Sequence, residues 1–398
     1  MKPESLHLET LLAHYAEDRA AHAGAVVPPI YQNSLFTFES WEAIDAAFDD
    51  RVANSIYTRG RNPTVALVEE KIARLAGGDR ARLFASGMAA ISSAVMHCVD
   101  AGDHIVTVKN IYGPANNLMN VFLRRKMGVE TTFVAGDRVE DFEAAITDRT
   151  RLIYLESPSS AVFGLQDIAA VAALARSRGI RTIIDNTWAT PVFQQPLALG
   201  IDFEVHSCSK YLGGHSDIVA GVVIGREDEM RTLAVREYEL LGGKMAPFEA
   251  WLILRSLRTL PMRMRQHQEN ALAVAHYLAA HPRIRQVRYP GLTSFPQYDL
   301  GRRQMSGYSG LLGFTLDTDD LPSIKRFFNG LEIFQIGVSW GGHESLIYAP
   351  AISYLKELPP EQFAGLGIAM GDMRISVGLE HADDLIADLD QALAGSGI

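Results

Sequence analysis

Short apolar runs alternate with segments of helical periodicity over residues 60–225 of the chain. Turn residues follow most runs, and the stretches between them repeat apolar positions at helical spacing. This alternation is typical of an α/β domain built around a mainly parallel sheet. The runs that we expect to form strands are Arg82 to Ala85, Ile105 to Val108, Thr131 to Val134, Leu152 to Leu155, Thr182 to Ile184, Phe203 to Val205 and Ile218 to Ile224.

Helical segments lie on both sides of this region. The segment from Asn62 to Ala76 predicts an amphipathic helix, because Asn62 can cap it and Pro63 suits its first position. The segment from Glu249 to Gln266 predicts a longer helix with a kink at Pro261. Farther along, the expected elements are the strands Leu311 to Leu316 and Met373 to Val377 and the helices Leu321 to Asn329 and His381 to Leu393.

The pattern therefore divides the chain into three parts. We expect an N-terminal arm over residues 1–60, a larger α/β domain over residues 61–255 and a smaller C-terminal α+β domain over residues 256–398. The boundaries rest on changes of periodicity, because no internal repeat or low-complexity linker marks them.

Composition and charge narrow the class of protein. With 398 residues, 47% of them apolar and 21% charged, the chain has the composition of a folded globular protein. A net charge of −10 gives no electrostatic support for binding nucleic acid or an acidic membrane. The N-terminus lacks the pattern of a secretory signal, and no apolar stretch is long enough to span a membrane. We expect a small-molecule partner.

Cysteine usage points in the same direction. The chain has only Cys98 and Cys208, with no CxxC spacing, so neither a disulfide framework nor a thiolate metal site is indicated. We expect a cytoplasmic protein that holds no metal.

Chemically distinctive residues follow several of the predicted strands. In open α/β sheets, ligands bind beyond the carboxyl ends of the strands. Ser86 and Gly87 open a helix there, and the free N–H groups of a helix N-terminus suit a phosphate. Taken alone, the same pair favours an ordinary helix cap. Asp185 ends another strand, where an unpaired buried carboxylate would be costly, so it should have a cationic partner.

Lys210 completes this pattern. It follows the strand at Phe203 to Val205 among hydroxyls, glycines and histidines. A lysine in a poorly solvated pocket loses its proton readily and can form a Schiff base. Pyridoxal phosphate needs such a lysine, an acid for its ring nitrogen, a phosphate cradle and an aromatic neighbour. Tyr112 is the candidate aromatic, although by itself it would suit ordinary packing.

Together, these segments resemble the Cys/Met-metabolism family of pyridoxal phosphate enzymes, the cystathionine lyases and synthases of fold type I. The resemblance covers about residues 57–380. It rests on YTRGRNPT (57–64), SGMAAI (86–91), LESP (155–158), DNTWA (185–189), HSCSKYLGGHSD (206–217), SWGGHESL (339–346) and RISVGLE (374–380). The resemblance implies a large fold type I domain with a mainly parallel sheet, a smaller C-terminal α+β domain and pyridoxal phosphate as cofactor.

The resemblance also implies roles for individual residues. Lys210 would be the Schiff-base lysine and general base, Asp185 the partner of the pyridine nitrogen and Tyr112 the stacking, catalytic aromatic. The other residues implied to surround the cofactor are Ser86, Gly87, Met88, Thr187, Ser207 and Ser209. The residues implied to bind the amino-acid substrate are Arg374, which would grip the α-carboxylate, and Ser339, Trp340 and Ser160.

A shared active site is implied as well. In the family, the tyrosine and arginine of the YxRxxNPT motif reach the phosphate site of a neighbouring subunit. By resemblance, Tyr57 and Arg59 would do so here, carried by the N-terminal arm, and Tyr57 would also be a catalytic residue. Taken alone, the two residues would suit a surface turn before a helix. A homotetramer, as a dimer of dimers, is the expected assembly.

The motifs leave the reaction open between two routes. Trp188, Trp340, Tyr112 with its Gly-Pro neighbours, and Ser159-Ser160 look most like bacterial cystathionine β-lyases, so α,β-elimination is the leading interpretation. The YTRGRNPT segment instead looks like the γ-eliminating branch. Val338 stands where cystathionine γ-lyases and γ-synthases typically carry glutamate, which favours a methionine γ-lyase-like or canavanine γ-lyase-like enzyme as the alternative.

Further alternatives carry less weight. An aminotransferase would use the same cofactor, and a catalytically silent protein would keep the pocket for binding alone. Ser160 replaces the asparagine of the family's ESPTNP motif, so one contact near the cofactor phenolate or the substrate carboxylate is altered.

Overall fold

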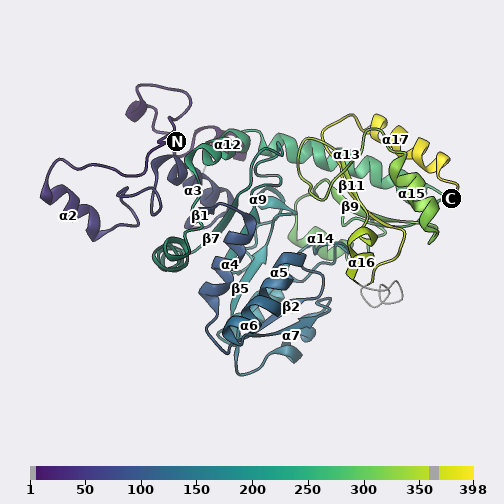
Figure 1. Ribbon diagram of the computed structural model, residues 1–398, viewed down its shortest axis with the longest axis horizontal. Coiled ribbons are helices and arrows are strands. Elements are labelled where there is room, and N and C mark those ends of the chain that lie inside the picture. The colour runs from purple at the N-terminus through teal and green to yellow at the C-terminus, as the bar shows by residue number, and fades with distance from the viewer. Residues whose placement is uncertain (1–5, 358–366) are drawn as a thin grey trace.

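The computed structural model describes residues 6–357 and 367–398 of the chain. A seven-stranded sheet forms the centre of the larger domain (Figure 1). Its spatial order is β1-β7-β6-β5-β4-β2-β3, and all neighbours are parallel except β7, which is antiparallel to both β1 and β6. The mainly parallel sheet is thus confirmed. Its strands are β1 (Arg80–Phe84), β2 (His104–Val108), β3 (Glu130–Val134), β4 (Thr150–Glu156), β5 (Arg181–Asp185), β6 (Phe203–Ser207) and β7 (Gly221–Gly225).

Helices precede, connect and follow these strands, and most of them contribute buried side chains. The first, α3, begins at Pro63 as predicted, with the Asn62 side chain accepting a 3.0 Å hydrogen bond from the Thr64 N–H. The others are α4 (Gly87–Cys98), α5 (Gly113–Asn117), α6 (Arg124–Met127), α7 (Val139–Ala145), α8 (Ile168–Ser177), α9 (Thr190–Phe193), α10 (Glu227–Leu233), α11 (Glu239–Leu241) and α12 (Pro247–Leu257), with π-helical turns at Leu118–Leu123 and Ala234–Tyr238.

The C-terminal part forms a second, five-stranded sheet in the order β10-β11-β12-β9-β8. Its pairings are antiparallel except β10 with β11, which agrees with the predicted smaller α+β unit. Its strands are β8 (Ile284–Arg288), β9 (Leu311–Leu316), β10 (Gln335–Ile336), β11 (Leu346–Tyr348) and β12 (Asp372–Ser376). Its helices are α13 (Leu260–Ala280), α14 (Tyr298–Gln304), α15 (Leu321–Asn329), α16 (Ala351–Glu357) and α17 (Ala382–Gly395).

Two predicted elements need correction. Glu249 to Gln266 is not one kinked helix, because α12 ends at Leu257 and α13 begins at Leu260. Pro261 lies in the first turn of α13, where its missing N–H costs no hydrogen bond, so the chain restarts a helix there. The strand expected from Ile218 begins only at Gly221, where backbone pairing with Phe84 and Ser207 starts.

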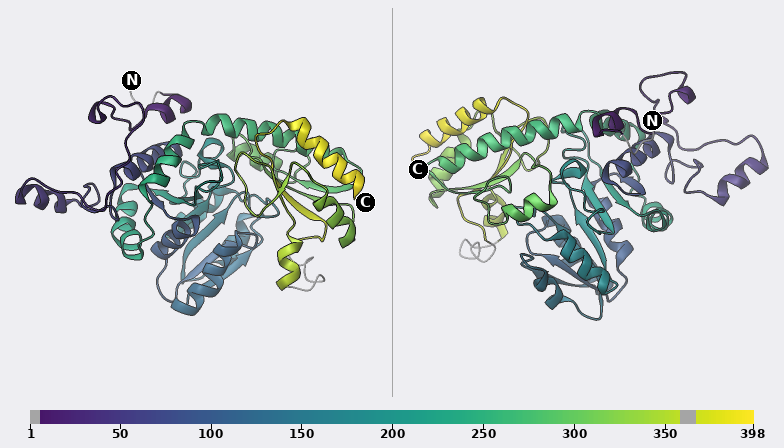
Figure 2. Two further views of the ribbon diagram at one scale, coloured as in Figure 1. Left: turned by 45° about the horizontal axis from the view of Figure 1, so that its top comes forward. Right: turned by 180° about the vertical axis from the view of Figure 1, so that it is seen from behind.

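The N-terminal segment extends away from both sheets. Figures 1 and 2 show α2 (Trp41–Asp49) at the far end of an arm that leaves the larger domain. The arm is fastened at its base, near α1 (Leu8–His14), where the buried Lys71 amine donates to the Leu12 carbonyl and to Glu17. Trp41 on α2 is 77% exposed in the single chain.

Among the described residues, no helix is long and apolar enough to cross a membrane. Both cysteines are buried and unpaired.

Candidate active site

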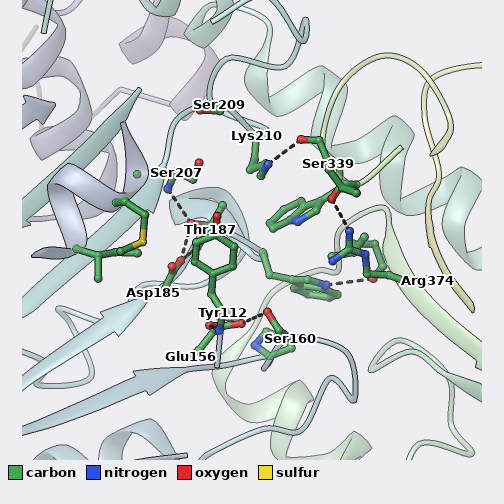
Figure 3. A pocket seen from close by; sticks show the side chains of 18 of the residues that line it. Tyr112, Glu156, Ser160, Asp185, Thr187, Ser207, Ser209, Lys210, Ser339 and Arg374 are labelled. Atoms are coloured by element: carbon green, nitrogen blue, oxygen red, sulfur yellow. Dashed lines mark hydrogen bonds between the residues drawn. The ribbon is translucent and has the colours of Figure 1, made fainter. Parts of the chain in front are cut away.

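The carboxyl ends of the large sheet and the loop before β11 enclose a cavity of about 620 Å³. Figure 3 shows the side chains that project into it. The structure brings together nearly all the residues singled out in the sequence. Those that line the cavity are Ser86, Gly87, Met88, Tyr112, Ser160, Asp185, Thr187, Ser207, Ser209, Lys210, Ser339, Trp340 and Arg374.

Lys210 lies in the loop after β6 and points across the cavity. Its amine donates to the Ser339 hydroxyl at 2.7 Å and stands 5.6 Å from the centre of the Trp340 ring. Burial, reinforced by the Arg374 guanidinium and opposed by Asp185, lowers the pKa of Lys210 to about 8. A sizeable fraction of this amine is therefore uncharged near neutral pH and available as a nucleophile or base.

The loop that faces Lys210 approaches it closely. Gly341 has φ of +82°, and a Cβ there would lie 2.9 Å from the Tyr211 backbone nitrogen and 3.2 Å from the Lys210 Cα. Glycine is thus required for both conformation and space. This contact holds Ser339 and Trp340 against the lysine.

Asp185 ends β5 on the opposite side of the cavity. Its Oδ1 accepts hydrogen bonds from the Thr187 N–H at 2.9 Å and the Thr187 hydroxyl at 2.5 Å. Burial raises the pKa of Asp185, and the Thr187 bonds and the charges of His206 and Lys210 oppose that rise. Within the described residues, no cation forms an ion pair with it, so the predicted cationic partner does not come from this part of the chain.

The turn from β1 into α4 forms a cradle of backbone groups. The Ser86 hydroxyl caps α4 by accepting the Ala89 N–H at 3.0 Å. A Cβ on Gly87 would lie 3.0 Å from the Ser207 Cβ, and one on Gly221 would lie 2.4 Å from the Ser86 carbonyl. These close approaches bring the N-terminus of α4 beside the loop that carries Ser207 and Lys210, so unpaired N–H groups and hydroxyls share one wall.

Tyr112 stands in the middle of the cavity (Figure 3). Its ring is partly exposed, and its backbone N–H donates to Glu156 at 2.6 Å. Burial and the neighbouring carboxylates of Asp185 and Glu156 raise the pKa of the Tyr112 hydroxyl, which therefore keeps its proton at neutral pH.

Arg374 on β12 faces the same space from the smaller sheet. One of its nitrogens donates to the Val338 carbonyl at 2.6 Å, and the guanidinium lies 5.2 Å from the centre of the Tyr348 ring. These contacts fix the plane of the guanidinium and leave further donors for a carboxylate. Trp188 donates to the Leu311 carbonyl at 3.0 Å and forms part of the apolar wall.

Tyr57 and Arg59 do not join this cluster. Neither residue lines the cavity of its own chain; Arg59 lies 5.5 Å from the centre of the Tyr57 ring, and Tyr57 is 49% exposed. Their predicted place in a neighbouring subunit's site remains a prediction.

Two carboxylates in the cavity wall carried no sequence-based expectation. Glu156, at the end of β4, accepts from Tyr112 and, at 2.5 Å, from the Ser160 hydroxyl. Glu344 accepts a 2.5 Å hydrogen bond from Ser216. Part of the signal for Glu156 is in the sequence, because it directly follows the predicted strand Leu152 to Leu155, but its position beside Asp185 comes only from the structure.

The cavity fits pyridoxal phosphate on structural grounds. Asp185 is a buried carboxylate with no ion-pair partner among residues 6–357 and 367–398, and it suits a protonated ring nitrogen. The cradle at Gly87 and Gly221 admits no side chain beside the α4 N-terminus, which suits a phosphate. Lys210 supplies an amine of lowered pKa, and Tyr112 supplies a ring in the same cavity.

Comparison with known proteins identifies the group. Residues 9–394 match the family described as Cys/Met metabolism PLP-dependent enzyme. The chain belongs to this family. Pyridoxal phosphate is accordingly its cofactor, and fold type I is its architecture.

Several relatives are similar over almost their whole length. The chain is 42% identical to an L-methionine gamma-lyase of Porphyromonas gingivalis over 396 residues, 97% of this chain and 98% of the relative. It is 40% identical to an L-methionine gamma-lyase of Pseudomonas putida over 390 residues, 97% of each chain. It is 37% identical to a cystathionine gamma-lyase of Bacillus subtilis over 385 residues, 97% of this chain and 98% of the relative. These names favour the γ-elimination alternative over the leading β-lyase interpretation.

Proposed function

We propose that the protein is a lyase that carries out α,γ-elimination on an amino acid with a heteroatom on its γ-carbon. The observation that carries this proposal is the full-length similarity to γ-lyases, with the catalytic candidates gathered in one cavity. It replaces the cystathionine β-lyase interpretation, which rested on local motifs around Trp188 and Ser160.

The residues of the chain divide the work as follows. Arg374 holds the substrate carboxylate through its remaining donors. Bound pyridoxal phosphate supplies an electron sink that acidifies hydrogens on the substrate carbons near the amino group. The uncharged amine of Lys210 accepts the proton from Cα and, in the γ route, shuttles a proton at Cβ. The protonated hydroxyl of Tyr112 donates to the departing heteroatom, a role that its raised pKa supports.

The apolar residues of the cavity wall favour a substrate whose side chain is uncharged. The cavity is lined by the aliphatic side chains of Val338, Val219 and Leu311 and by the rings of Trp188 and Trp340. An apolar wall favours a thioether such as that of methionine.

A second candidate substrate has an oxygen-linked cationic side chain, such as canavanine. The observation that favours it is Glu344, a carboxylate in the same cavity whose side chain is 20% exposed. A guanidinium would complement that charge. The two candidates share the same elimination chemistry and differ in the leaving group.

Product analysis tests the proposal. The holoenzyme is incubated separately with methionine, cystathionine, cysteine conjugates and canavanine, and the products are identified by mass spectrometry. We expect 2-oxobutyrate, ammonia and methanethiol from methionine, or homoserine with the released leaving group from canavanine if water adds at the γ-carbon. Pyruvate with homocysteine from cystathionine, and no γ-products, would overturn the proposal in favour of β-elimination.

A further inference from the structure

Two buried carboxylates lie side by side at the edge of the large sheet. Glu156 and Asp185 are the last residues of the parallel strands β4 and β5 and are direct partners in register. Both line the cavity, and they are only 7% and 8% exposed. Two neighbouring buried carboxyl groups strongly disfavour the state in which both are ionised. One of the pair therefore retains a proton over a wide pH range.

Both carboxyls accept hydrogen bonds, so the nearby cation decides which of them keeps the proton. Asp185 receives two hydrogen bonds from Thr187, and the Lys210 amine opposes the rise of its pKa. Glu156 receives a backbone N–H bond from Tyr112 and a hydroxyl bond from Ser160, and the Ser160 backbone N–H also acts on it. Among the described residues, the groups that act most strongly on Glu156 include no cation. Asp185 is thus the better-stabilised anion. The proton belongs to Glu156.

The other groups packed around Glu156 reinforce this assignment. Tyr154 on the same strand is fully buried, and its hydroxyl finds no partner among the described residues. Lys210 and Arg374, the cations among the described residues of the cavity, act on Asp185 and on Tyr112, respectively. Burial first, and then the charge of Asp185, raise the pKa of Glu156 to about 8.

The position of that proton controls the hydroxyl of Ser160. Glu156 Oε2 already accepts the Tyr112 N–H at 2.6 Å, so a proton on the carboxyl belongs on Oε1, which faces Ser160 at 2.5 Å. A serine hydroxyl has one proton to donate. When Glu156 is ionised, Ser160 donates to it. When Glu156 is neutral, the acid donates to Ser160, and the serine proton is free to point into the cavity.

We propose that Glu156 and Ser160 form a proton-sharing pair that positions Tyr112 and switches the Ser160 hydroxyl between two partners. With neutral Glu156, Ser160 donates to an oxygen of the bound cofactor or substrate, and with ionised Glu156 that donor is withdrawn. The step is a single proton transfer between Glu156 Oε1 and solvent. Both are positioning residues, Glu156 acting through the backbone of Tyr112. The expected effects of Glu156 variants on kcat rest on the proposed function, whereas the protonation of Glu156 can be measured without it.

The test begins with a measurement that needs no substrate. Infrared difference spectra of the holoenzyme, labelled with ¹³C at the glutamate side-chain carboxyls, are recorded as the pH is raised. We expect a protonated-carboxyl band that disappears with a midpoint above about pH 7 and is missing in Glu156→Gln. Ser160→Ala should raise the midpoint, because the carboxylate loses a hydrogen-bond donor. Ser159→Ala, which removes the neighbouring hydroxyl of the same cavity wall, should leave the midpoint unchanged.

Kinetics then test the positioning role. Glutamine at position 156 mimics the neutral acid, because its carbonyl accepts the Tyr112 N–H and its amide donates to Ser160. We expect Glu156→Gln to keep most of the wild-type kcat and to lose the fall in kcat on the alkaline side. Glu156→Ala should lower kcat at every pH, by about tenfold or more, because the Tyr112 backbone loses its acceptor.

The outcomes are distinguishable from failure of the proposed reaction. If wild type and Glu156→Gln showed no difference in the protonated-carboxyl signal above about pH 6, the proton-sharing pair would be overturned. An alkaline limb that is identical in wild type and Glu156→Gln would overturn it as well. If the enzyme released pyruvate instead of γ-products, the lyase proposal would fail while the infrared titration still reported on Glu156.

Discussion

At the scale of the residue, the sequence predicts which functional side chains follow the strands. Lys210, Asp185 and Tyr112 each follow an apolar run, and the carboxyl ends of parallel strands meet at one edge of a sheet. Glu156 follows the same rule. Its position beside Asp185 cannot be predicted from the sequence, because it depends on the register between β4 and β5. Register between strands distant in sequence is not encoded in local pattern.

Lys210 makes the first prediction. Covalent attachment of pyridoxal phosphate to the apoprotein requires an uncharged amine, and the pKa of Lys210 is lowered to about 8 by burial. The attachment rate should rise about tenfold per pH unit below pH 8 and level off above it. Stopped-flow absorbance of the cofactor measures this rate. A rate that keeps rising towards pH 10, as for an ordinary lysine, would contradict the environment described for Lys210.

The same residue gives a prediction for turnover. Lys210→Ala should still bind the cofactor weakly and should lose at least about a thousandfold in kcat, because the base for the substrate carbon is gone. Steady-state assays with the active substrate measure the loss. Substantial residual elimination would show that another group removes the proton.

Arg374 makes a specific prediction about substrate binding. Arg374→Lys keeps the charge but loses the planar, two-pronged geometry that suits a carboxylate. We expect KM for the amino acid to rise about tenfold or more, with a smaller change in the affinity for pyridoxal phosphate. Steady-state kinetics and cofactor titration separate the two effects, and an unchanged KM would remove Arg374 from the carboxylate site.

At the scale of the element, helices with clear caps were predictable, and elements set by tertiary packing were not. The helix beginning at Pro63 and the one from Leu321 to Asn329 appear where the pattern places them. The pattern around Pro261 predicts a kink within one helix, but proline also suits the first turn of a helix, which is where the structure has it. The short strands β10 and β11 carry too few residues for a periodic signal.

The junction of β7 with α4 allows a test of the phosphate cradle. Gly221→Ala would place a methyl group 2.4 Å from the Ser86 carbonyl and 2.7 Å from the Gly87 Cα. We expect the free energy of unfolding to fall by about 1–3 kcal/mol and pyridoxal phosphate to bind more weakly. Chemical denaturation and cofactor titration measure both. Gly395→Ala is the control, because nothing lies within 4 Å of its added methyl group, and it should leave cofactor binding unaltered.

At the scale of the whole molecule, the arm is the feature that the single chain leaves unexplained. Trp41, Phe48 and Leu35 on the arm are exposed, and Tyr57 and Arg59 lie outside the cavity. Exposed apolar clusters of this kind mark contact surfaces. We propose that the arm completes the site of a second copy of the chain.

Subunit mixing tests the shared site. Arg59→Ala and Lys210→Ala subunits are inactive by different defects, so a hybrid dimer would contain one intact site if Arg59 serves its neighbour. When the two variants pair at random, about half of the dimers are hybrids. Each hybrid has one working site of its two, so about a quarter of the wild-type activity should return. Unfolded and refolded mixtures, compared with each variant alone, give the readout. No recovery in a mixture shown by native mass spectrometry to contain hybrids would place Arg59 outside the neighbour's site.

The central claim, elimination across Cα and Cγ, is tested most directly by hydrogen exchange at the β-carbon. The holoenzyme is incubated in D2O with norvaline, which has no leaving group, and proton NMR follows the substrate hydrogens. The account predicts that the Cα hydrogen and then the Cβ hydrogens are replaced by deuterium, and that Lys210→Ala abolishes both exchanges. Exchange at Cα alone would contradict the γ-elimination mechanism and restore the β-lyase interpretation.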